Sequence, residues 1–240
     1  MEHQLSICYE DADLLIIDKP AGLVVHSDGR TEEETLSNII ARLYPALAEV
    51  GGLHTLDSER YVPRMGILHR LDRDTSGMIA IAKHDEAFYF LQRQFLDRSI
   101  KKEYRAFVSG VPEPRSGVID LPIGRSRSDF RKWATGADAR GTLRPATSAY
   151  EVLQDNGEFA FLALRPKTGR THQLRVHLSA IGHPILHDPK YGGPEGLGFS
   201  RLALHAFSLA LRLPSGKDLV CTAPLPDDVV SALALLEKKA

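Results

Sequence analysis

Short apolar runs separated by turn residues dominate the hydrophobic pattern of the chain. Two such runs, residues 5–9 and 13–18, flank an Asp-Ala pair, which predicts an N-terminal hairpin that ends at the Lys-Pro-Ala-Gly sequence of residues 19–22. Similar apolar runs predict further strands at residues 78–82, 103–109, 146–153, 159–164, 202–212 and 218–222.

A helical period appears in four segments. Leu36, Ile39 and Leu43 recur at helical spacing, and Pro45 ends that segment. The same period predicts helices over residues 84–97, 171–181 and 227–238. Strands outnumber helices and do not alternate with them regularly. The predicted class is therefore α+β, with a mixed, mostly antiparallel sheet and flanking helices.

Two stretches lack a clear period. Residues 46–66 are of mixed character and contain glycine, so we expect a loop there. Residues 124–145 are polar, basic and glycine-bearing, which predicts a long loop or an irregular hairpin of the kind that more often carries function. No repeat and no Ser/Gly-rich or Pro-rich linker divides the chain, so we expect one domain over residues 1–240.

The composition is that of an ordinary soluble globular protein. The chain has 240 residues, of which 43% are hydrophobic and 25% charged. Two cysteines, Cys8 and Cys221, are too few for a disulfide framework, which favours a reducing compartment. The N-terminus is acidic, and no stretch approaches the roughly 18 apolar residues of a membrane span. We expect a cytoplasmic protein with no membrane partner.

Charge is nearly balanced overall but unevenly distributed. The formal net charge is -1, yet residues 1–20 are strongly acidic. Three other segments carry an excess of Lys and Arg: residues 93–105, 125–144 and 165–190. If these segments share one face, they form a footprint for a phosphate backbone. If each is a separate solvated surface, they have no common partner.

Residues 67–77, ILHRLDRDTSG, are the stretch richest in candidate chemistry. A carboxylate held among guanidinium groups stays ionised and can act as a nucleophile or a base. A plain turn, in which Asp72 or Asp74 accepts backbone N–H bonds and the arginines are surface charges, fits the same residues. The composition of the stretch leaves both interpretations open.

Residues 69–77 match the HRLDxxTSG signature at every fixed position, and the chain thereby resembles the RluA-type pseudouridine synthases. The resemblance continues in order through residues 16–26, 102–104, 164–177, 183–192 and 204–206. Residues 44–62 have no obvious counterpart. Some branches of the family carry an additional N-terminal S4-type RNA-binding domain. This chain starts at the catalytic core, so we expect no S4 domain.

The resemblance implies an isomerase that converts uridine in RNA to pseudouridine. The N1–C1′ glycosidic bond breaks, the uracil turns, and the base rejoins through C5. Asp72 would be the catalytic carboxylate, by a covalent-adduct or a glycal route. Arg175 would pair with Asp72 and keep it anionic, and Tyr104 would stack on the target base. The reaction needs no redox change and no external group, so the resemblance implies no cofactor and no metal.

The target uridine must leave its stack before a pocket can close on it. The resemblance implies seven RNA-binding residues: Arg70, Arg131, Lys132, Trp133, Lys167, Arg170 and His172. Arg70 would fill the vacated space, and His69 would support the loop. Trp133 departs from the aliphatic or Met residue expected in the clamping loop, and its ring would stack on a base. The partner would be ribosomal RNA, transfer RNA or both, with no DNA, and we expect a monomer.

Two rival interpretations remain at this point. The pair His183 and His187 suggests a metal-dependent hydrolase, although it lacks the Glu of a His-Glu-x-x-His site and Pro184 interrupts the helix such a site requires. A catalytically silent RNA-binding protein with the same fold is the other alternative.

Overall fold

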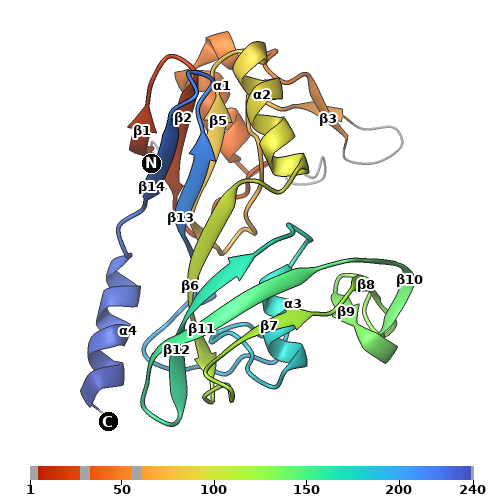
Figure 1. Ribbon diagram of the computed structural model, residues 1–240, viewed down its shortest axis with the longest axis vertical. Coiled ribbons are helices and arrows are strands. Elements are labelled where there is room, and N and C mark those ends of the chain that lie inside the picture. The colour runs from red at the N-terminus through yellow and green to blue at the C-terminus, as the bar shows by residue number, and fades with distance from the viewer. Residues whose placement is uncertain (1–4, 28–32, 56–60, 239–240) are drawn as a thin grey trace. The chain divides into compact units, whose positions relative to one another are not determined.

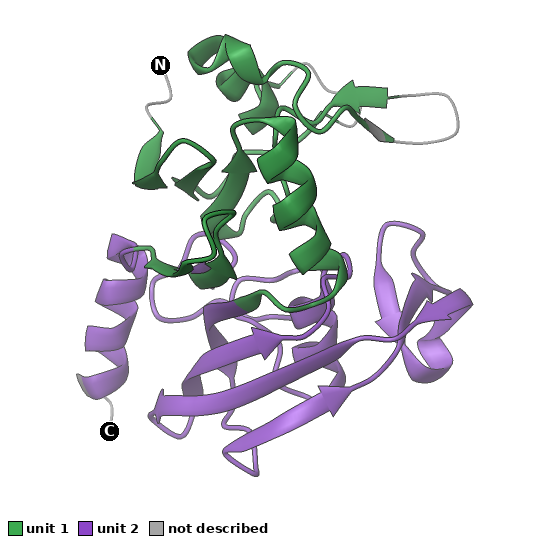
Figure 2. Ribbon diagram, turned by 45° about the horizontal axis from the view of Figure 1, so that its top comes forward, with its two compact units in different colours: residues 1–101, 208–223 green, residues 102–207, 224–240 purple. Residues whose placement is uncertain are grey.

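The structure is a computed structural model that describes residues 5–27, 33–55 and 61–238. Two compact units make up the chain (Figure 2). Unit 1 takes residues 1–101 and 208–223, and unit 2 takes residues 102–207 and 224–240. Each unit therefore combines segments that lie far apart in the sequence. The single domain expected from the sequence stays a prediction.

Unit 1 contains the predicted N-terminal hairpin. Strands β1 (Ser6–Glu10), β2 (Leu14–Lys19) and β5 (Ser76–Ala82) pair antiparallel in that order (Figure 1). The Asp11 carboxylate accepts the N–H groups of Asp13 and Leu14, both at 2.8 Å, which closes the turn between β1 and β2. Every residue of β5 is buried, which explains the unbroken apolar sequence of residues 78–82.

The helices of unit 1 begin at side-chain caps. Helix α1 (Leu36–Leu43) starts with a capping box between Thr35 and Asn38, and the side chain of His84 caps α2 (Asp85–Leu96). Strand β14 (Asp218–Thr222) pairs with the end of β13 (Leu204–Arg212) and completes the unit.

The prediction of a loop over residues 46–66 is partly wrong. The 3₁₀ turn η1 (Pro45–Leu47) is followed by a small hairpin of β3 (Leu53–Thr55) and β4 (Tyr61–Pro63). Leu53 and Tyr61 are exposed there, so the hairpin buries no alternating apolar face that the sequence pattern could show.

Unit 2 is built on an antiparallel ladder. Its strands run in the order β6 (Lys101–Ser109), β12 (Phe159–Pro166), β11 (Thr147–Asp155) and β7 (Ser116–Asp120) (Figure 1). Phe107, Phe161 and Phe199 pack together in its core, with ring centroids 4.7 to 5.2 Å apart. Helices α3 (Gln173–Ala180) and α4 (Asp227–Lys238) bury apolar residues in the same core. The α+β class and the mostly antiparallel pairing are confirmed.

The basic stretch predicted as a long loop or irregular hairpin is a small sheet with its own turn. Strands β8 (Ile123–Ser126), β9 (Trp133–Thr135) and β10 (Ala139–Arg144) pair in the order β10-β8-β9. The 3₁₀ turn η2 (Gly136–Asp138) connects β9 to β10. We call residues 123–144 the basic hairpin. None of the helices in the described part of the chain is long and apolar enough to cross a membrane.

His205 makes the fold sensitive to acid. Burial, reinforced by the Arg201 cation, lowers the pKa of this imidazole to about 4. The folded chain thus keeps His205 neutral down to about pH 4, whereas an unfolded chain protonates it near pH 6.5. The contribution of neutral His205 to the unfolding free energy is therefore complete above pH 6.5 and decreases as the pH falls. At pH 4 the unfolding free energy is lower by about 3 kcal/mol. Urea unfolding of wild type and His205→Gln at pH 7 and pH 4.5 should show a smaller acid loss in the variant. An equal loss would contradict this assignment.

Candidate active site

The HRLD loop is fastened to strand β5 next to it. The N–H of Ala80 donates to Nε2 of His69 at 3.0 Å, and the His69 ring stacks on Phe95 with centroids 4.9 Å apart. The N–H of Leu68 also donates to the carbonyl of Ala80, at 3.1 Å. His69 therefore supports the loop, as the sequence predicted.

Asp72 is the more enclosed of the two carboxylates in this loop. It is half-buried, whereas Asp74 and the neighbouring Arg73 are exposed. The N–H of Thr75 donates to the backbone carbonyl of Asp72 at 3.2 Å, so a main-chain oxygen closes this turn. Arg73 pairs with the exposed Glu33 at 2.6 Å. Arg70 is exposed, and its role in RNA binding stays a prediction.

Lys19 is a supporting residue that the sequence did not reveal. Its side chain is fully buried, and Nζ donates to the carbonyls of Pro20, Leu23 and Arg73 at 2.7, 2.9 and 3.0 Å. The N–H of Gly22 reaches the same Arg73 carbonyl at 2.9 Å. Two donors thus hold the main chain one residue beyond Asp72. The Lys-Pro-Ala-Gly sequence was the available signal, but it indicated only a turn.

Tyr104 lies half-buried on β6, opposite Leu164 of β12, and packs against the core of unit 2. Lys102 precedes it by two residues and therefore shares its face of the strand. Burial lowers the pKa of Lys102, whose amine lies close to Gly169.

Arg175 has a partner that the sequence did not predict. Its Nε and Nη2 donate to the two carboxylate oxygens of Asp188 at 2.7 and 2.8 Å, and the Asp188 side chain is fully buried. The guanidinium also lies over the Tyr191 ring, 5.1 Å from its centroid. The pairing of Arg175 with Asp72 stays a prediction, because Asp72 belongs to unit 1 and Arg175 to unit 2.

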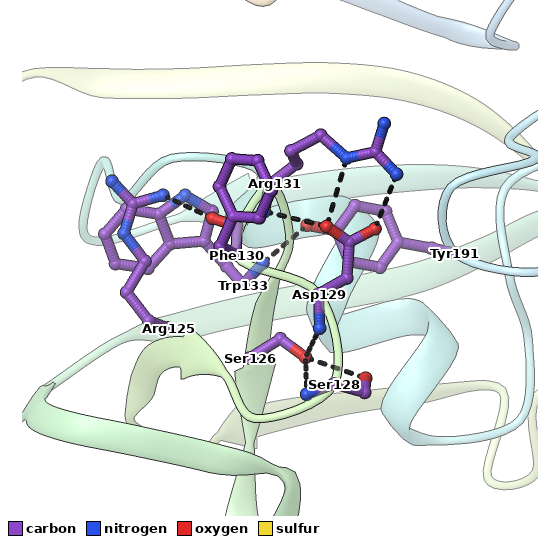
Figure 3. Close-up of polar contacts among 8 residues, drawn as sticks. All are labelled: Arg125, Ser126, Ser128, Asp129, Phe130, Arg131, Trp133 and Tyr191. Carbon is purple, nitrogen blue, oxygen red and sulfur yellow. Dashed lines mark hydrogen bonds and ion pairs between the residues drawn. The ribbon is translucent and has the colours of Figure 1, made fainter.

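The two aromatic side chains of the basic hairpin have different surroundings (Figure 3). Trp133 is half-buried, and the Arg125 guanidinium lies 4.3 Å from its ring centroid. Phe130 is 73% exposed at the tip. Arg131 is fixed beside it by a two-pronged bond to Asp129, at 3.1 and 3.2 Å, which lowers the pKa of that carboxyl. Phe130 is therefore the more exposed of the two aromatic rings of the basic hairpin, and stacking by Trp133 stays a prediction.

The other predicted RNA-binding residues differ in their exposure and in their contacts with the rest of the protein. The Lys167 side chain is exposed, and Lys132 is half-buried within the turn. Nε of Arg170 donates to the Pro145 carbonyl at 3.2 Å. His172 adopts a left-handed backbone, φ 56°, directly before α3, and its Nδ1 lies 2.8 Å from the Tyr191 hydroxyl. Arg170 and His172 thus support the local geometry.

His183, one of the two histidines that suggested a metal site, bonds to the main chain. Nδ1 of His183 lies 3.0 Å from the Ser109 carbonyl. Over residues 5–27, 33–55 and 61–238, no group of three or more His, Cys, Asp or Glu side chains is arranged to hold a metal ion.

Comparison with known proteins identifies the family. The family model for RNA pseudouridylate synthase matches residues 13–180, more than half of the chain. The chain belongs to the RNA pseudouridylate synthase family. Two solved human members have similar folds. The RNA pseudouridylate synthase domain containing 1 protein superposes with a TM-score of 0.73 at 28% identity, covering 94% of this chain and 85% of that one. The human RNA pseudouridylate synthase domain containing 4 protein superposes with a TM-score of 0.74 at 30% identity, covering 97% of this chain and 93% of that one.

Curated relatives of this family member carry a ribosomal name. The ribosomal large subunit pseudouridine synthase D of Nitrosomonas europaea is 41% identical over 238 residues, which cover 95% of this chain and 64% of that protein. The protein of the same name from Zymomonas mobilis is 40% identical over 234 residues, covering 94% and 70%. The chain thus spans about two thirds of the length of these relatives.

Proposed function

We propose that this protein converts specific uridines of large-subunit ribosomal RNA to pseudouridine, with Asp72 as the catalytic carboxylate. Family membership supports the reaction, and the names of the relatives support the substrate. The structure of the HRLD loop supports the assignment of Asp72. Lys19 and His69 each make a hydrogen bond that anchors the loop. Asp72 is half-buried, whereas its charged neighbours Arg70, Arg73 and Asp74 are exposed.

The chemistry assigns one task to each catalytic residue. Asp72 either adds to C1′ of the flipped uridine or removes the 2′ proton, and both routes break the N1–C1′ bond. The freed uracil turns and C5 bonds to C1′. In the first route this bond displaces the Asp72 carboxylate from C1′, and in the second Asp72 returns its proton to C2′. The C5 proton then leaves and N1 gains a proton, so the nucleotide keeps its composition and Asp72 is regenerated. Tyr104 stacks on the base, and the Arg175 cation pairs with the Asp72 carboxylate.

RNA is held by four cations, of which Arg70, Arg131 and Lys167 are exposed and Lys132 is half-buried. Arg70 fills the space that the flipped base leaves, while Arg131, Lys132 and Lys167 contact phosphates. Counterions leave the phosphates when these side chains bind, so affinity falls with salt. We place the reaction in the cytoplasm and expect a monomer that acts on RNA and not on DNA, with transfer RNA as the alternative substrate.

Mapping pseudouridine in cellular RNA tests this proposal. Ribosomal and transfer RNA would be compared between cells with and without the gene, and between gene-deleted cells that carry wild type or Asp72→Asn. We expect one or a few ribosomal positions to lose pseudouridine on deletion and to regain it only with wild type. Loss at transfer RNA positions alone would change the substrate assignment. An unchanged map would contradict the activity, and restoration by Asp72→Asn would contradict the catalytic role.

Phe130→Ala should weaken RNA binding without unfolding the protein. An exposed ring that stacks on one base contributes about 1 to 3 kcal/mol, so the Kd should rise about fivefold to a hundredfold. Leu96→Ala is the matched control, because Leu96 is 72% exposed on α2 and carries no proposed contact. Filter binding at fixed salt measures both variants. Equal affinities would contradict the assignment of Phe130 as the stacking residue.

A further inference from the structure

Tyr191 contacts two parts of the proposed site that the sequence treats as separate. It follows the turn that begins at Asp188, and the structure brings it against both the basic hairpin and Arg175. Neither the sequence pattern nor the proposed reaction assigns it a role.

One contact of Tyr191 reaches the basic hairpin. The main-chain N–H of Trp133, the first residue of β9, donates to the Tyr191 hydroxyl at 3.1 Å (Figure 3). Trp133 and Tyr191 also pack together against the small apolar cluster of Ile123, Ala146 and Val176. The position of β9 is therefore linked to the position of the phenol.

The other contacts of Tyr191 reach Arg175 and α3. The Arg175 guanidinium lies over its ring. The Tyr191 N–H donates to the Asp188 carbonyl at 3.1 Å, and the Ser179 hydroxyl donates to the Tyr191 carbonyl at 2.8 Å. One short turn thus carries both groups that orient Arg175, the buried Asp188 carboxylate and the aromatic face.

The hydroxyl of Tyr191 uses its hydrogen-bonding capacity on both sides. It accepts the Trp133 N–H, and its O–H can donate to Nδ1 of His172, 2.8 Å away, when the imidazole carries its proton on Nε2. A phenylalanine keeps the ring under Arg175 but makes neither bond. The two functions of the side chain can therefore be separated by removing one oxygen atom.

We propose that Tyr191 couples RNA engagement by the basic hairpin to the position of the Arg175 guanidinium. The inference rests on the proposed function, in which the hairpin grips RNA and Arg175 serves Asp72. When RNA fixes the hairpin, the Trp133 N–H holds the phenol, and the phenol ring holds the guanidinium in its working orientation. Tyr191 is a positioning residue, since it acts through Arg175.

A double-mutant cycle tests the coupling. Wild type, Tyr191→Phe, Phe130→Ala and the double variant are compared for kcat and KM in pseudouridine formation on ribosomal RNA. Loss of the hydroxyl bonds should lower kcat about threefold to tenfold at saturating RNA. Phe130→Ala should lower kcat when Tyr191 is present but leave kcat unchanged in the Tyr191→Phe background, because the link is already broken.

Tyr150→Phe is the matched control. The Tyr150 hydroxyl, like that of Tyr191, bonds to the main chain of unit 2: it donates to the Pro114 carbonyl at 3.0 Å. Tyr150 lies on β11, and this bond involves neither the basic hairpin nor Arg175. It should leave kcat unchanged. Hydrogen exchange at the Trp133 amide should accelerate in Tyr191→Phe and stay unchanged in Tyr150→Phe, which reports the broken bond independently of activity.

The outcomes separate this inference from the proposed function. If wild type forms no pseudouridine, the proposed function fails. If wild type is active and the kcat losses of Tyr191→Phe and Phe130→Ala multiply in the double variant, the coupling is overturned. A kcat for Tyr191→Phe equal to that of Tyr150→Phe would overturn it as well.

Discussion

Asp72→Asn should reduce pseudouridine formation at least about a thousandfold, while the affinity for RNA stays within a few fold. The amide has the shape of the carboxylate but cannot add to C1′ or take a proton, so the step that breaks the glycosidic bond loses its reactive group. RNA binding depends on the exposed cations and on stacking, which the substitution does not touch. Single-turnover rates and Kd values on the same ribosomal RNA measure the two effects separately.

Asp74→Asn is the matched control for this substitution. Asp74 lies in the same turn, two residues farther along, and carries the same charge, but its side chain is exposed. We expect a rate within a few fold of wild type. Comparable rate losses for Asp72→Asn and Asp74→Asn would mean that the loop's total charge matters, and the assignment of Asp72 would then be wrong.

Asp188→Asn should both destabilise the protein and slow the reaction. It leaves the Arg175 guanidinium, 12% exposed, without the buried carboxylate that now takes two of its N–H bonds. Breaking such a pair from one side costs about 3 to 5 kcal/mol of unfolding free energy. Because the same bonds orient Arg175, kcat should fall about tenfold or more in the folded fraction. Urea unfolding and kcat at saturating RNA check the two parts.

Asp228→Asn provides the comparison. Asp228 forms a bond of the same geometry with Arg201, at 2.6 and 2.8 Å, but the carboxylate is 32% exposed and the pair has no role in the proposed site. We expect a loss of about 1 kcal/mol and an unchanged kcat. If Asp188→Asn lowered the unfolding free energy and kcat no more than Asp228→Asn does, Asp188 would not be the residue that orients Arg175.

The sequence predicted those features that depend on local pattern. Hydrophobic period gave the N-terminal hairpin, the buried strand β5 and the helices, because each element buries a regular set of side chains. It missed β7, where Val118 is 64% exposed and Ile119 is the one fully enclosed apolar residue. It also missed the β3 and β4 hairpin, where Leu53 and Tyr61 are exposed.

The candidate site was predicted by motif, but its supports were not. Asp188 and Lys19 both lie within sequences that the resemblance covers. Their roles depend on what the folded chain brings to them: the Arg175 guanidinium in one case and the Arg73 carbonyl in the other. The resemblance likewise pointed to Trp133 as the stacking residue, because it lies where the family has a clamping loop. The fold places Arg125 over that ring and leaves Phe130 exposed, a difference that only tertiary packing decides.

The central claim, that this chain isomerises uridine through Asp72, is tested most directly by tritium release. Ribosomal RNA with ³H at uridine C5 would be incubated with the purified chain, and the tritium released to water would be compared with the pseudouridine formed. We predict equal molar amounts with wild type and Asp74→Asn, and none with Asp72→Asn. No release by wild type, or undiminished release by Asp72→Asn, would contradict the claim.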